Sequence, residues 1–514
     1  MISDAEDRCR VRPYVLANAA VAAWLVLGQL HRLHSCDSVI FTLIGLQEWT
    51  PFFWEQDRVG MLTTLLVCWI RDPFVNLTVH TGLMAFSGLT LPLVLGRLVS
   101  RDRRTPMLVT LGNAIFLWKA PDVLHDAVLI VCVYPLALTL GVCAVLLLDG
   151  PRGNWLGLGT KILGVLALLA LAHWTYLAIA VFLSVAIAIR AWTSPQSSNS
   201  DSRIARLAGP LANWRVYVLA ICTGVAVAGV FAWMFRLRAS DPGIVPVSTK
   251  ALPAEMWMDS FVRFFAAAAD YPMFVEWVLS LAVPSSIGLA ISLIRNPRGV
   301  LATAIAVLPL LVASLVEVAF NATREWPALN QHHPRYLLAL FASSGLAMLL
   351  VGWLPLLQTV LAGRRATVAG WLAVVLLFGA ATIRYGFPDP VASRDELDRF
   401  GIITDEAISE DCDGIGGEPF VAVPQTFHAN MVLYERGSSK VIYYAGSRGK
   451  PGLPPYRHRW NRGQFGDRFR LATEPEQLAY SLDQADWIGL TPSGSLERRG
   501  DAIVIPMRAK PMDP

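Results

Sequence analysis

Charged residues are scarce in this sequence. Only 16% of its 514 residues are Asp, Glu, Lys or Arg, 54% are hydrophobic, and the mean hydropathy is +0.47. A soluble domain of this size does not bury so much apolar surface, so the composition excludes an ordinary soluble protein and indicates a polytopic membrane protein. The net charge is only +4 and follows partly from loop arginines, so nucleic acid is not an expected partner.

Cysteines and catalytic nucleophile motifs are scarce as well. The seven cysteines are scattered, and most lie within apolar runs, where they act as small apolar residues. The segment Pro492-Ser493-Gly494-Ser495 is a turn that lacks the Gly-x-Ser-x-Gly spacing of a nucleophile elbow. No clear internal repeat is present, and this counts against a transporter built from paired repeats.

Eleven apolar stretches can be read as membrane spans, for which a bilayer needs about 20 residues each. The first is too long and too weakly flanked by small residues for a cleaved signal peptide, so we expect a retained helix. The third is short. The sequence therefore predicts an α-helical polytopic membrane protein with about eleven transmembrane helices, near residues 13–32, 74–97, 105–118, 127–148, 155–172, 174–190, 214–235, 273–294, 299–320, 337–361 and 367–386.

Arginine clusters orient these spans. Short loops rich in Lys and Arg stay in the cytoplasm, and such clusters precede the first span, follow the second and mark later alternate loops. They consist of Arg8, Arg10, Arg12, Arg97, Arg101, Arg103, Arg104, Arg203, Arg206, Arg295, Arg298, Arg364 and Arg365. The pattern predicts a cytoplasmic N-terminus and an extracytoplasmic tail. From the style of composition we expect the inner membrane of a bacterium.

Most other ionisable residues fall in the outer loops. The first outer loop, residues 33–73, carries Asp37 directly after the first span and later an aromatic segment that ends in Glu55, Asp57 and Arg58. A carboxylate just above the bilayer is well placed to act as a base. Alternatively, the two aspartates only solvate the loop, and Arg58 pairs with Asp57 or Glu55.

The second outer segment packs Lys119, Asp122, His125 and Asp126 into a short turn between apolar runs. Charges at the membrane rim are retained for function or as satisfied pairs. His125 and Asp126 could ligate a divalent metal ion together with Asp37, although this segment has no HxxxH, DxD or CxxC spacing. The alternative is an ion pair between Lys119 and Asp122 that caps a helix.

The third outer segment contains His332, His333, Arg335 and Tyr336 directly before an apolar span. Arginine and histidine at the start of a helix suit a phosphate, because charge-assisted hydrogen bonds are strong and the helix N-terminus adds positive potential. The alternative is an interfacial tyrosine beside an arginine that reaches lipid headgroups.

The composition changes near Pro388, where the chain becomes charged and rich in turns. Residues 420–423, 440–444 and 502–505 are strand-like, and residues 395–400 and 474–482 could be helical. The sequence thus predicts a transmembrane domain over residues 1–386 and a small extracytoplasmic α/β domain over residues 387–514, which is large enough for its own core.

The order of these parts resembles the GT-C superfamily of glycosyltransferases. The resemblance covers roughly residues 1–386 and rests on three segments: His34-Ser35-Cys36-Asp37-Ser38, the aromatic-rich Pro51–Gly60, and His332-His333-Pro334-Arg335-Tyr336-Leu337. Members of this superfamily have many spans, a long first outer loop with a catalytic Asp and interfacial helices, and often a C-terminal extracytoplasmic domain. The chain departs from protein O-mannosyltransferases and aminoarabinose transferases at Ser38, where they typically have Glu.

The resemblance implies sugar transfer from a polyprenyl-phosphate carrier to an envelope glycan or lipid acceptor on the outer face. Asp37 would take the acceptor proton, and the developing phosphate charge would be stabilised by basic side chains. Those would be Arg335, His332 or His333, with Lys119 and Arg58, and the displacement would invert the anomeric centre. Asp57, Glu55, Asp122, His125, Asp126 and Tyr336 are candidates for substrate contacts or for a second acid.

Two other function classes fit parts of the pattern. A transporter or flippase of a lipid-linked sugar would place charged, broken helices at the midplane of the bilayer, whereas here the ionisable groups cluster at the outer rim. A glycan polymerase or ligase would share the outward site and the polyprenyl donor, but would depend more on arginines in a large late loop.

Overall fold

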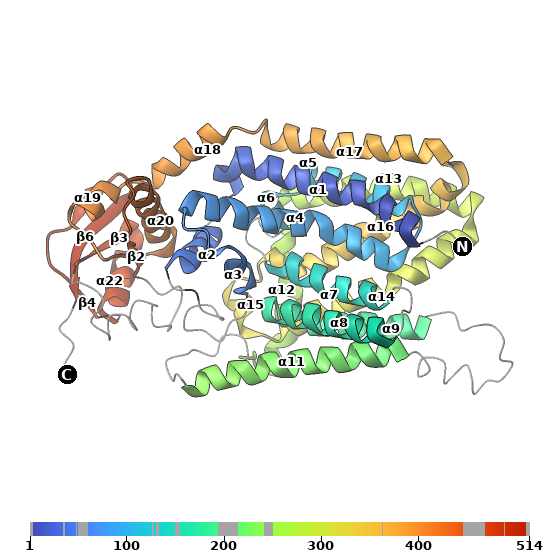
Figure 1. The fold of residues 1–514 in the computed structure, drawn as a ribbon, viewed down its shortest axis with the longest axis horizontal. Coiled ribbons are helices and arrows are strands. Elements are labelled where there is room, and N and C mark those ends of the chain that lie inside the picture. The colour runs from blue at the N-terminus through green and yellow to red at the C-terminus, as the bar shows by residue number, and fades with distance from the viewer. Residues whose placement is uncertain are drawn as a thin grey trace. The chain divides into compact units, whose positions relative to one another are not determined.

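The computed structural model describes the chain except for several short segments. The described residues are 4–33, 36–47, 49, 60–125, 128–129, 133–149, 155–193, 214–240, 250–361, 363–445, 468–487 and 489–509. Each of the eleven predicted spans coincides with a helix in this part of the chain (Figure 1). These helices are α1 (Asp4–Leu33), α4 (Pro73–Val99), α5 (Thr105–Lys119), α7 (Val133–Asp149), α8 (Trp155–Thr175), α9 (Ile179–Thr193), α11 (Trp214–Ser240), α13 (Pro272–Arg295), α14 (Pro297–Ala322), α16 (Leu338–Val360) and α17 (Gly363–Tyr385).

Seven of the described helices are long and apolar enough to cross a membrane, namely α4, α8, α11, α13, α14, α16 and α17, and α1 and α7 contain shorter apolar stretches. The prediction of an α-helical, multi-pass membrane protein is therefore confirmed. Shorter helices connect the long ones: α2 (Cys36–Leu46), α3 (Leu62–Val67), α6 (Asp122–His125), η2 (Ala254–Met256), α12 (Trp257–Ala269), α15 (Glu325–Leu329) and η3 (Pro334–Leu337).

The chain divides into two compact units. Unit 1 consists of Met1–Leu25, Met84–Trp233 and Thr249–Phe387, and unit 2 consists of Val26–Leu83, Met234–Ser248 and Pro388–Pro514. Unit 1 thus contains most of the helical bundle, and unit 2 gathers α2 and α3 of the first outer loop with the C-terminal residues.

Small residues bring α13 and α16 of unit 1 into close contact. A Cβ added at Gly352 would lie 2.6 Å from the carbonyl oxygen of Ser285, and one added at Gly288 would lie 2.8 Å from the ring of Trp353. The hydroxyl of Ser292 donates a 2.8 Å hydrogen bond to the carbonyl of Gly352. Close backbone approach over small residues is the usual packing of membrane helices, where apolar burial alone gives little driving force between them.

Two buried amides from neighbouring helices bind the backbone of α4 near Pro92, which lies inside the helix and cannot donate a hydrogen bond within it. The carbonyl of Leu89 accepts from the Nδ2 of Asn18, at 2.9 Å, and from the Nδ2 of Asn113, at 2.7 Å. Buried polar side chains from α1 and α5 therefore hold this part of α4 in place.

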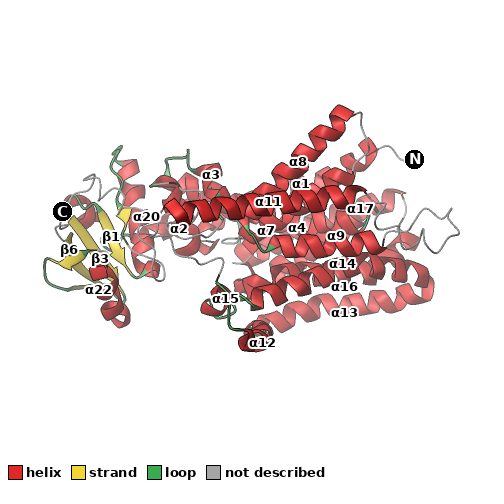
Figure 2. Ribbon diagram, turned by 90° about the horizontal axis from the view of Figure 1, so that it is seen from below, coloured by secondary structure: helices red, strands yellow, loops and turns green. Residues whose placement is uncertain are grey.

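Unit 2 contains a six-stranded sheet in the order β2-β1-β3-β6-β4, with β5 paired to β6. The strands are β1 (Gly414–Gly417), β2 (Tyr443–Tyr444), β3 (Arg468–Thr473), β4 (Leu490–Pro492), β5 (Glu497–Arg499) and β6 (Ala502–Ala509), and the helices around them are α18 (Pro390–Leu397), η4 (Asp398–Phe400), α19 (Thr404–Ser409), α20 (Pro419–Glu435), η5 (Pro475–Gln477) and α22 (Leu478–Trp487). Strand β1 is parallel to β2 and β3, whereas β6 is antiparallel to β3, β4 and β5. Figure 2 shows the sheet with α20 and α22 beside it.

The core of this sheet follows the alternation of its strands. Phe469 and Leu471 of β3 pack with Ile503, Ile505 and Met507 of β6 in one buried cluster, against which α22 also packs. The predicted α/β fold of the tail, its strand at residues 502–505 and its helix at residues 474–482 are therefore confirmed.

The strand expected at residues 420–423 is wrong, because these residues lie in α20. The side chain of Glu418 accepts a hydrogen bond from the backbone N–H of Val421, and Pro419 occupies the first turn. A capping side chain followed by proline is a helix-start signal, and it outweighs the strand propensity of the apolar run.

The first outer loop packs against the tail within unit 2. Helix α2 contacts α20, and the side chain of Gln47 donates to the carbonyl of Ile442 at 3.3 Å and accepts from the backbone N–H of Tyr444 at 3.4 Å. The side-chain amide of Gln47 thus hydrogen-bonds the backbone at the short strand β2, although Gln47 lies almost 400 positions earlier in the sequence.

Candidate functional site

The second and third outer segments meet in unit 1. Helix α6, which carries Asp122 and His125, lies against η3, which carries Arg335 and Tyr336. The predicted residues of these two segments therefore belong to one region. It is bordered by the starts of α13 and α16 and by the end of α17.

A strained turn presents the histidines of the third segment. Gln331 and His332 both adopt left-handed backbone conformations, with φ of 53° and 55°, which residues other than glycine rarely take. The turn is held by the backbone N–H of His332, which donates to the carbonyl of Pro327 at 2.9 Å. The Nε2 of His332 lies 2.9 Å from the hydroxyl of Ser260 on α12, so the turn and this helix are linked.

Helix α12 has one buried face and one exposed face. Ser260, Phe264 and Ala268 are buried, whereas Met258 and Val262 are exposed apolar residues. The ring of Phe264 makes an edge contact with His332, with 5.0 Å between the ring centroids. The buried face of α12 therefore contacts the third outer segment.

Arg335 is the cation of the third segment. The pKa of His333 is lowered to about 4, chiefly by burial and further by the nearby guanidinium of Arg335. Burial also lowers the pKa of His332. Both imidazoles are thus neutral near pH 7 and can supply hydrogen bonds but little charge. The guanidinium of Arg335 lies over the ring of Tyr336 at 5.3 Å and donates to the Oδ1 of Asn330 at 2.9 Å.

His125 is buried, with 2% of its surface exposed. Its Nε2 lies 3.0 Å from the carbonyl of Phe116, and its Nδ1 hydrogen-bonds the hydroxyl of Tyr385. Burial lowers its pKa to about 4, so the ring is neutral. These contacts hold the imidazole between α5 and α17.

The charged residues near His125 do not form the ion pair between Lys119 and Asp122 that the sequence offered as an alternative. Asp122 pairs with Arg384 on α17 rather than with Lys119. The ammonium of Lys119 lies 3.9 Å from the carboxylate of Glu276 and 4.7 Å from the ring of Trp118. Lys119 therefore remains at the rim of the bundle with only a long, partly exposed ion pair.

The remaining predicted residues fall at or beyond the edge of the described chain. Asp37 lies in the first turn of α2, and its side chain is outside the described part. Glu55, Asp57, Arg58 and Asp126 lie outside the described residues. Among the residues that are described, no three His, Cys, Asp or Glu side chains come together as metal ligands.

A cluster of polar aromatic residues that the sequence did not reveal lies at the end of α14. Tyr176, between α8 and α9, donates to the Oδ1 of Asn321 at 3.2 Å, and its ring lies 4.4 Å from that of Tyr134. The rings of Tyr134 and Tyr336 are 5.8 Å apart. Glu317, one turn before Asn321, is 3% exposed.

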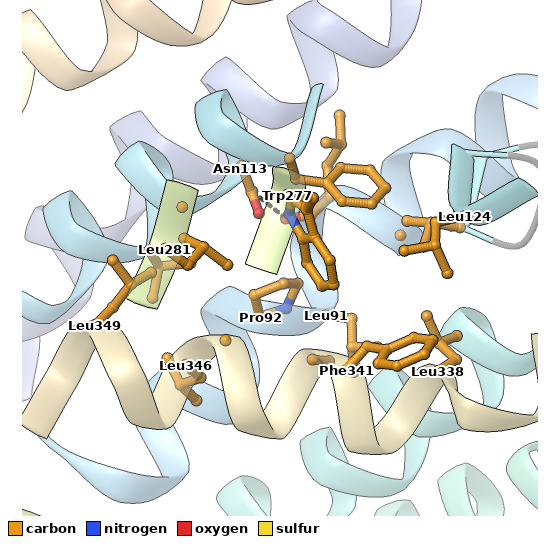
Figure 3. A pocket seen from close by; sticks show the side chains of 18 residues that line it. Leu91, Pro92, Asn113, Leu124, Trp277, Leu281, Leu338, Phe341, Leu346 and Leu349 are labelled. Carbon is orange, nitrogen blue, oxygen red and sulfur yellow. Dashed lines mark hydrogen bonds between the residues drawn. The ribbon is translucent and has the colours of Figure 1, made fainter. Parts of the chain in front are cut away.

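An apolar cavity of about 80 Å³ lies in the same unit (Figure 3). Its lining extends along α16 from Leu338 to Leu349, and α4, α5 and α13 contribute Pro92, Asn113 and Trp277. The indole nitrogen of Trp277 is buried and has no hydrogen-bond partner among the described residues. The rest of the lining is almost entirely hydrocarbon, so the cavity suits an apolar chain and excludes a charged group.

The fold is shared with known membrane enzymes. The crystal structure of ArnT from Cupriavidus metallidurans bound to undecaprenyl phosphate aligns with a TM-score of 0.52 at 13% identity, over 96% of this chain and 97% of that one. The apo state of the same protein gives 0.40 at 11% identity, over 96% and 97%. An oligosaccharyltransferase from Archaeoglobus fulgidus tethered with an acceptor peptide gives 0.43 at 11% identity, over 93% and 70%. No protein-family model and no curated protein matches the chain.

Proposed function

We propose that this chain, whose fold is that of the GT-C superfamily, is a glycosyltransferase that moves a sugar from a polyprenyl-phosphate donor to an acceptor on the extracytoplasmic face of the membrane. The observation that carries the proposal is the apolar cavity in the helical bundle, whose lining residue Leu338 follows Tyr336 by two positions and Arg335 by three. A lipid-linked sugar phosphate needs these three environments side by side.

The cavity supports a lipid-linked donor. From Leu338 to Leu349 its lining spans twelve residues of α16, about 16 Å at the rise of an α-helix. An isoprenoid chain placed there would bury hydrocarbon against hydrocarbon. Asn113 uses its amide on the Leu89 carbonyl, so this polar group does not disfavour the chain. ArnT, which shares the fold, is bound to undecaprenyl phosphate in its crystal structure.

The charged residues suit transfer with inversion. As the sugar leaves, charge develops on the lipid phosphate, and a cation at the start of α16 stabilises it. Arg335 supplies that cation, while the neutral His332 and His333 supply hydrogen bonds, with Lys119 and Arg58 as further candidates. Asp37 takes the proton of the acceptor hydroxyl as base. A single displacement of this kind inverts the anomeric carbon.

The acceptor is an envelope glycan or lipid, and the membrane is the bacterial inner membrane with the C-terminal domain outside. The alternation of arginine-rich loops supports this orientation. A divalent metal ion stays an open part of the proposal, and loss of activity on chelation, with recovery on adding Mg²⁺ or Mn²⁺, would establish it.

The test compares the wild-type chain with Asp37→Asn, both purified in lipid. Release of polyprenyl phosphate is measured from a panel of polyprenyl-phosphate sugars, with crude cell-envelope material as acceptor. We expect the substitution to abolish turnover and to leave donor binding intact. Asp270→Asn is the matched control, because Asp270 is an exposed acid at the end of α12, and it should keep full activity.

Other outcomes redirect the proposal. If Asp37→Asn turns over as fast as the wild type, the base lies elsewhere, with Asp57 and Asp126 as the next variants. If no donor is ever consumed but lipid-linked sugar crosses the bilayer of sealed vesicles, the chain is a flippase. If only preassembled glycans are joined, it is a polymerase or ligase.

A further inference from the structure

Glu317 is the one acidic side chain that is buried among the described residues, and it lies inside the helical bundle. Its Oε2 has no hydrogen-bond partner in the described part of the chain. A buried carboxyl oxygen without a hydrogen-bond partner destabilises a fold, and ionisable residues within membrane helices are usually kept for function. A group that hydrogen-bonds this oxygen would remove the cost.

The hydroxyl of Tyr336 has the same property. The residue is 5% exposed, and no described side chain or backbone group accepts from or donates to its phenol. The ring of Tyr134 lies 4.4 Å from that of Tyr176 and 5.8 Å from that of Tyr336. Glu317 lies one turn of α14 before Asn321, to which Tyr176 donates, so the two unsatisfied groups belong to one cluster. Tyr176 itself is satisfied by Asn321, which donates back to it at 3.0 Å.

The chemistry of the two groups selects their ligand. A carboxyl group offers oxygens that accept hydrogen bonds and, when protonated, an O–H that donates, and a phenol both donates and accepts. An ammonium group, which only donates, would leave the proton of Tyr336 without an acceptor. Sugar hydroxyls both donate and accept, so they satisfy the phenol and either form of the carboxyl group.

The cluster is also connected to the donor path. Tyr336 directly follows Arg335, and Leu338, two residues further along, lines the apolar cavity. A lipid-linked donor likewise carries its lipid chain, its phosphate and its sugar next to one another. The rings of Tyr134 and Tyr176 add apolar faces of the kind on which the C–H side of a sugar packs.

We propose that Glu317 and Tyr336 bind hydroxyl groups of the donor sugar and so determine which sugar the chain accepts. This inference rests on the proposed transfer from a polyprenyl-phosphate sugar. Both residues hold and orient the sugar and take no part in breaking the bond to phosphate.

Binding to the full chain in lipid nanodiscs tests the site without requiring turnover. The probes are polyprenyl-phosphate glucose, mannose and arabinose, with polyprenyl phosphate alone as the sugarless reference. We expect the wild type to bind one of the sugars at least tenfold more tightly than the reference. Glu317→Gln and Tyr336→Phe should lose this difference and keep their affinity for polyprenyl phosphate.

Matched controls are Glu255→Gln and Tyr217→Phe, because both residues are exposed and lie outside the cluster. They should bind as the wild type does. Monodeoxy forms of the preferred sugar sharpen the result. The form that lacks the recognised hydroxyl should bind the wild type about tenfold to a hundredfold more weakly and should bind Glu317→Gln no more weakly than the parent sugar does.

The inference is overturned if no sugar binds the wild type more tightly than polyprenyl phosphate, or if the difference survives both substitutions. Failure of the sugar site and failure of the proposed transferase activity give different results. Sugar binding that depends on Glu317, in a chain that never releases polyprenyl phosphate, keeps the site and rejects the reaction. Turnover with equal sugar preference in the wild type and Glu317→Gln keeps the reaction and rejects the site.

Discussion

Filling the apolar cavity should stabilise the protein and weaken its use of long-chain donors. Ala342 of α16 lines the cavity, and Ala342→Leu adds three carbon atoms to it. At about 24 cal/mol per Å³, removing a cavity of about 80 Å³ is worth about 2 kcal/mol. Burying three more carbons at about 0.8 kcal/mol each gives about 2.4 kcal/mol, which agrees.

The free energy of donor binding should become less favourable by a similar amount. A loss of about 2 kcal/mol corresponds to roughly a 30-fold weaker affinity, because the leucine occupies space that the isoprenoid chain fills. Transfer assays should therefore show a raised KM for a long-chain polyprenyl-phosphate sugar and an unchanged KM for a donor with a single isoprene unit. Thermal unfolding in detergent should move upward by about 2 °C, given the entropy of unfolding of a chain of this length.

Ala302→Leu is the control, since Ala302 is exposed on α14 and the added carbons do not enter the cavity. Two results would refute the reasoning. If Ala342→Leu lowers the unfolding temperature, the space does not accept a leucine. If it raises the temperature while the KM for the long-chain donor stays the same, the cavity exists but holds no part of the donor.

Three further predictions concern other parts of the chain. In Gly88→Val the new Cβ would lie 2.1 Å from the carbonyl oxygen of Val128. The yield of folded protein in size-exclusion chromatography should therefore fall sharply. Gly82→Ala is the control and should express normally, because nothing lies within 4 Å of its added Cβ. Burial lowers the pKa of His428, so the folded tail favours the neutral ring, and stability that is fully present above about pH 6.5 is lost as the pH falls below it. Protection of the α20 amides from hydrogen exchange, taken relative to the intrinsic exchange rate at each pH, should therefore decrease from pH 7 to pH 5 in the wild type and less in His428→Gln. Burial raises the pKa of Cys412 to about 11, so at pH 8 maleimide should label it at least a hundredfold more slowly than free cysteine, as measured by mass spectrometry.

The membrane helices could be predicted from the sequence because each is a continuous apolar run, and a bilayer demands such runs. The third segment also has the expected arrangement, since its residues are adjacent in the chain and only their local turn had to be found. The left-handed conformation of His332 was not predictable. It depends on backbone and side-chain contacts to Pro327 and Ser260, and the latter is 72 residues away.

The cluster around Tyr176 was missed because its members come from four separate segments of the chain. One signal was available: Glu276 and Glu317 are the acidic residues inside the predicted spans, and such residues are functional candidates by default. Only the structure separates them, because Glu276 is exposed beside Lys119, whereas Glu317 is buried.

The sheet of the tail shows a different limit. Strand β1 has the sequence Gly414-Ile415-Gly416-Gly417, and glycine is depleted in strands. A Cβ at Gly416 would lie 2.9 Å from the carbonyl oxygen of Ala445, and one at Gly417 would lie 2.1 Å from that of Ala472. The glycines are therefore required by the close approach of neighbouring strands, which local propensity does not record.

The unsatisfied carboxyl oxygen of Glu317 has a consequence for engineering this protein. Directed evolution that selects only for resistance to heat or detergent should favour replacement of Glu317 early, since an apolar side chain there removes a buried polar group that lacks a partner. The most stable variants from such a selection would then be those that distinguish least between one sugar and another. A stabilised form intended for structural work with bound donor should therefore be selected with residue 317 held as glutamate.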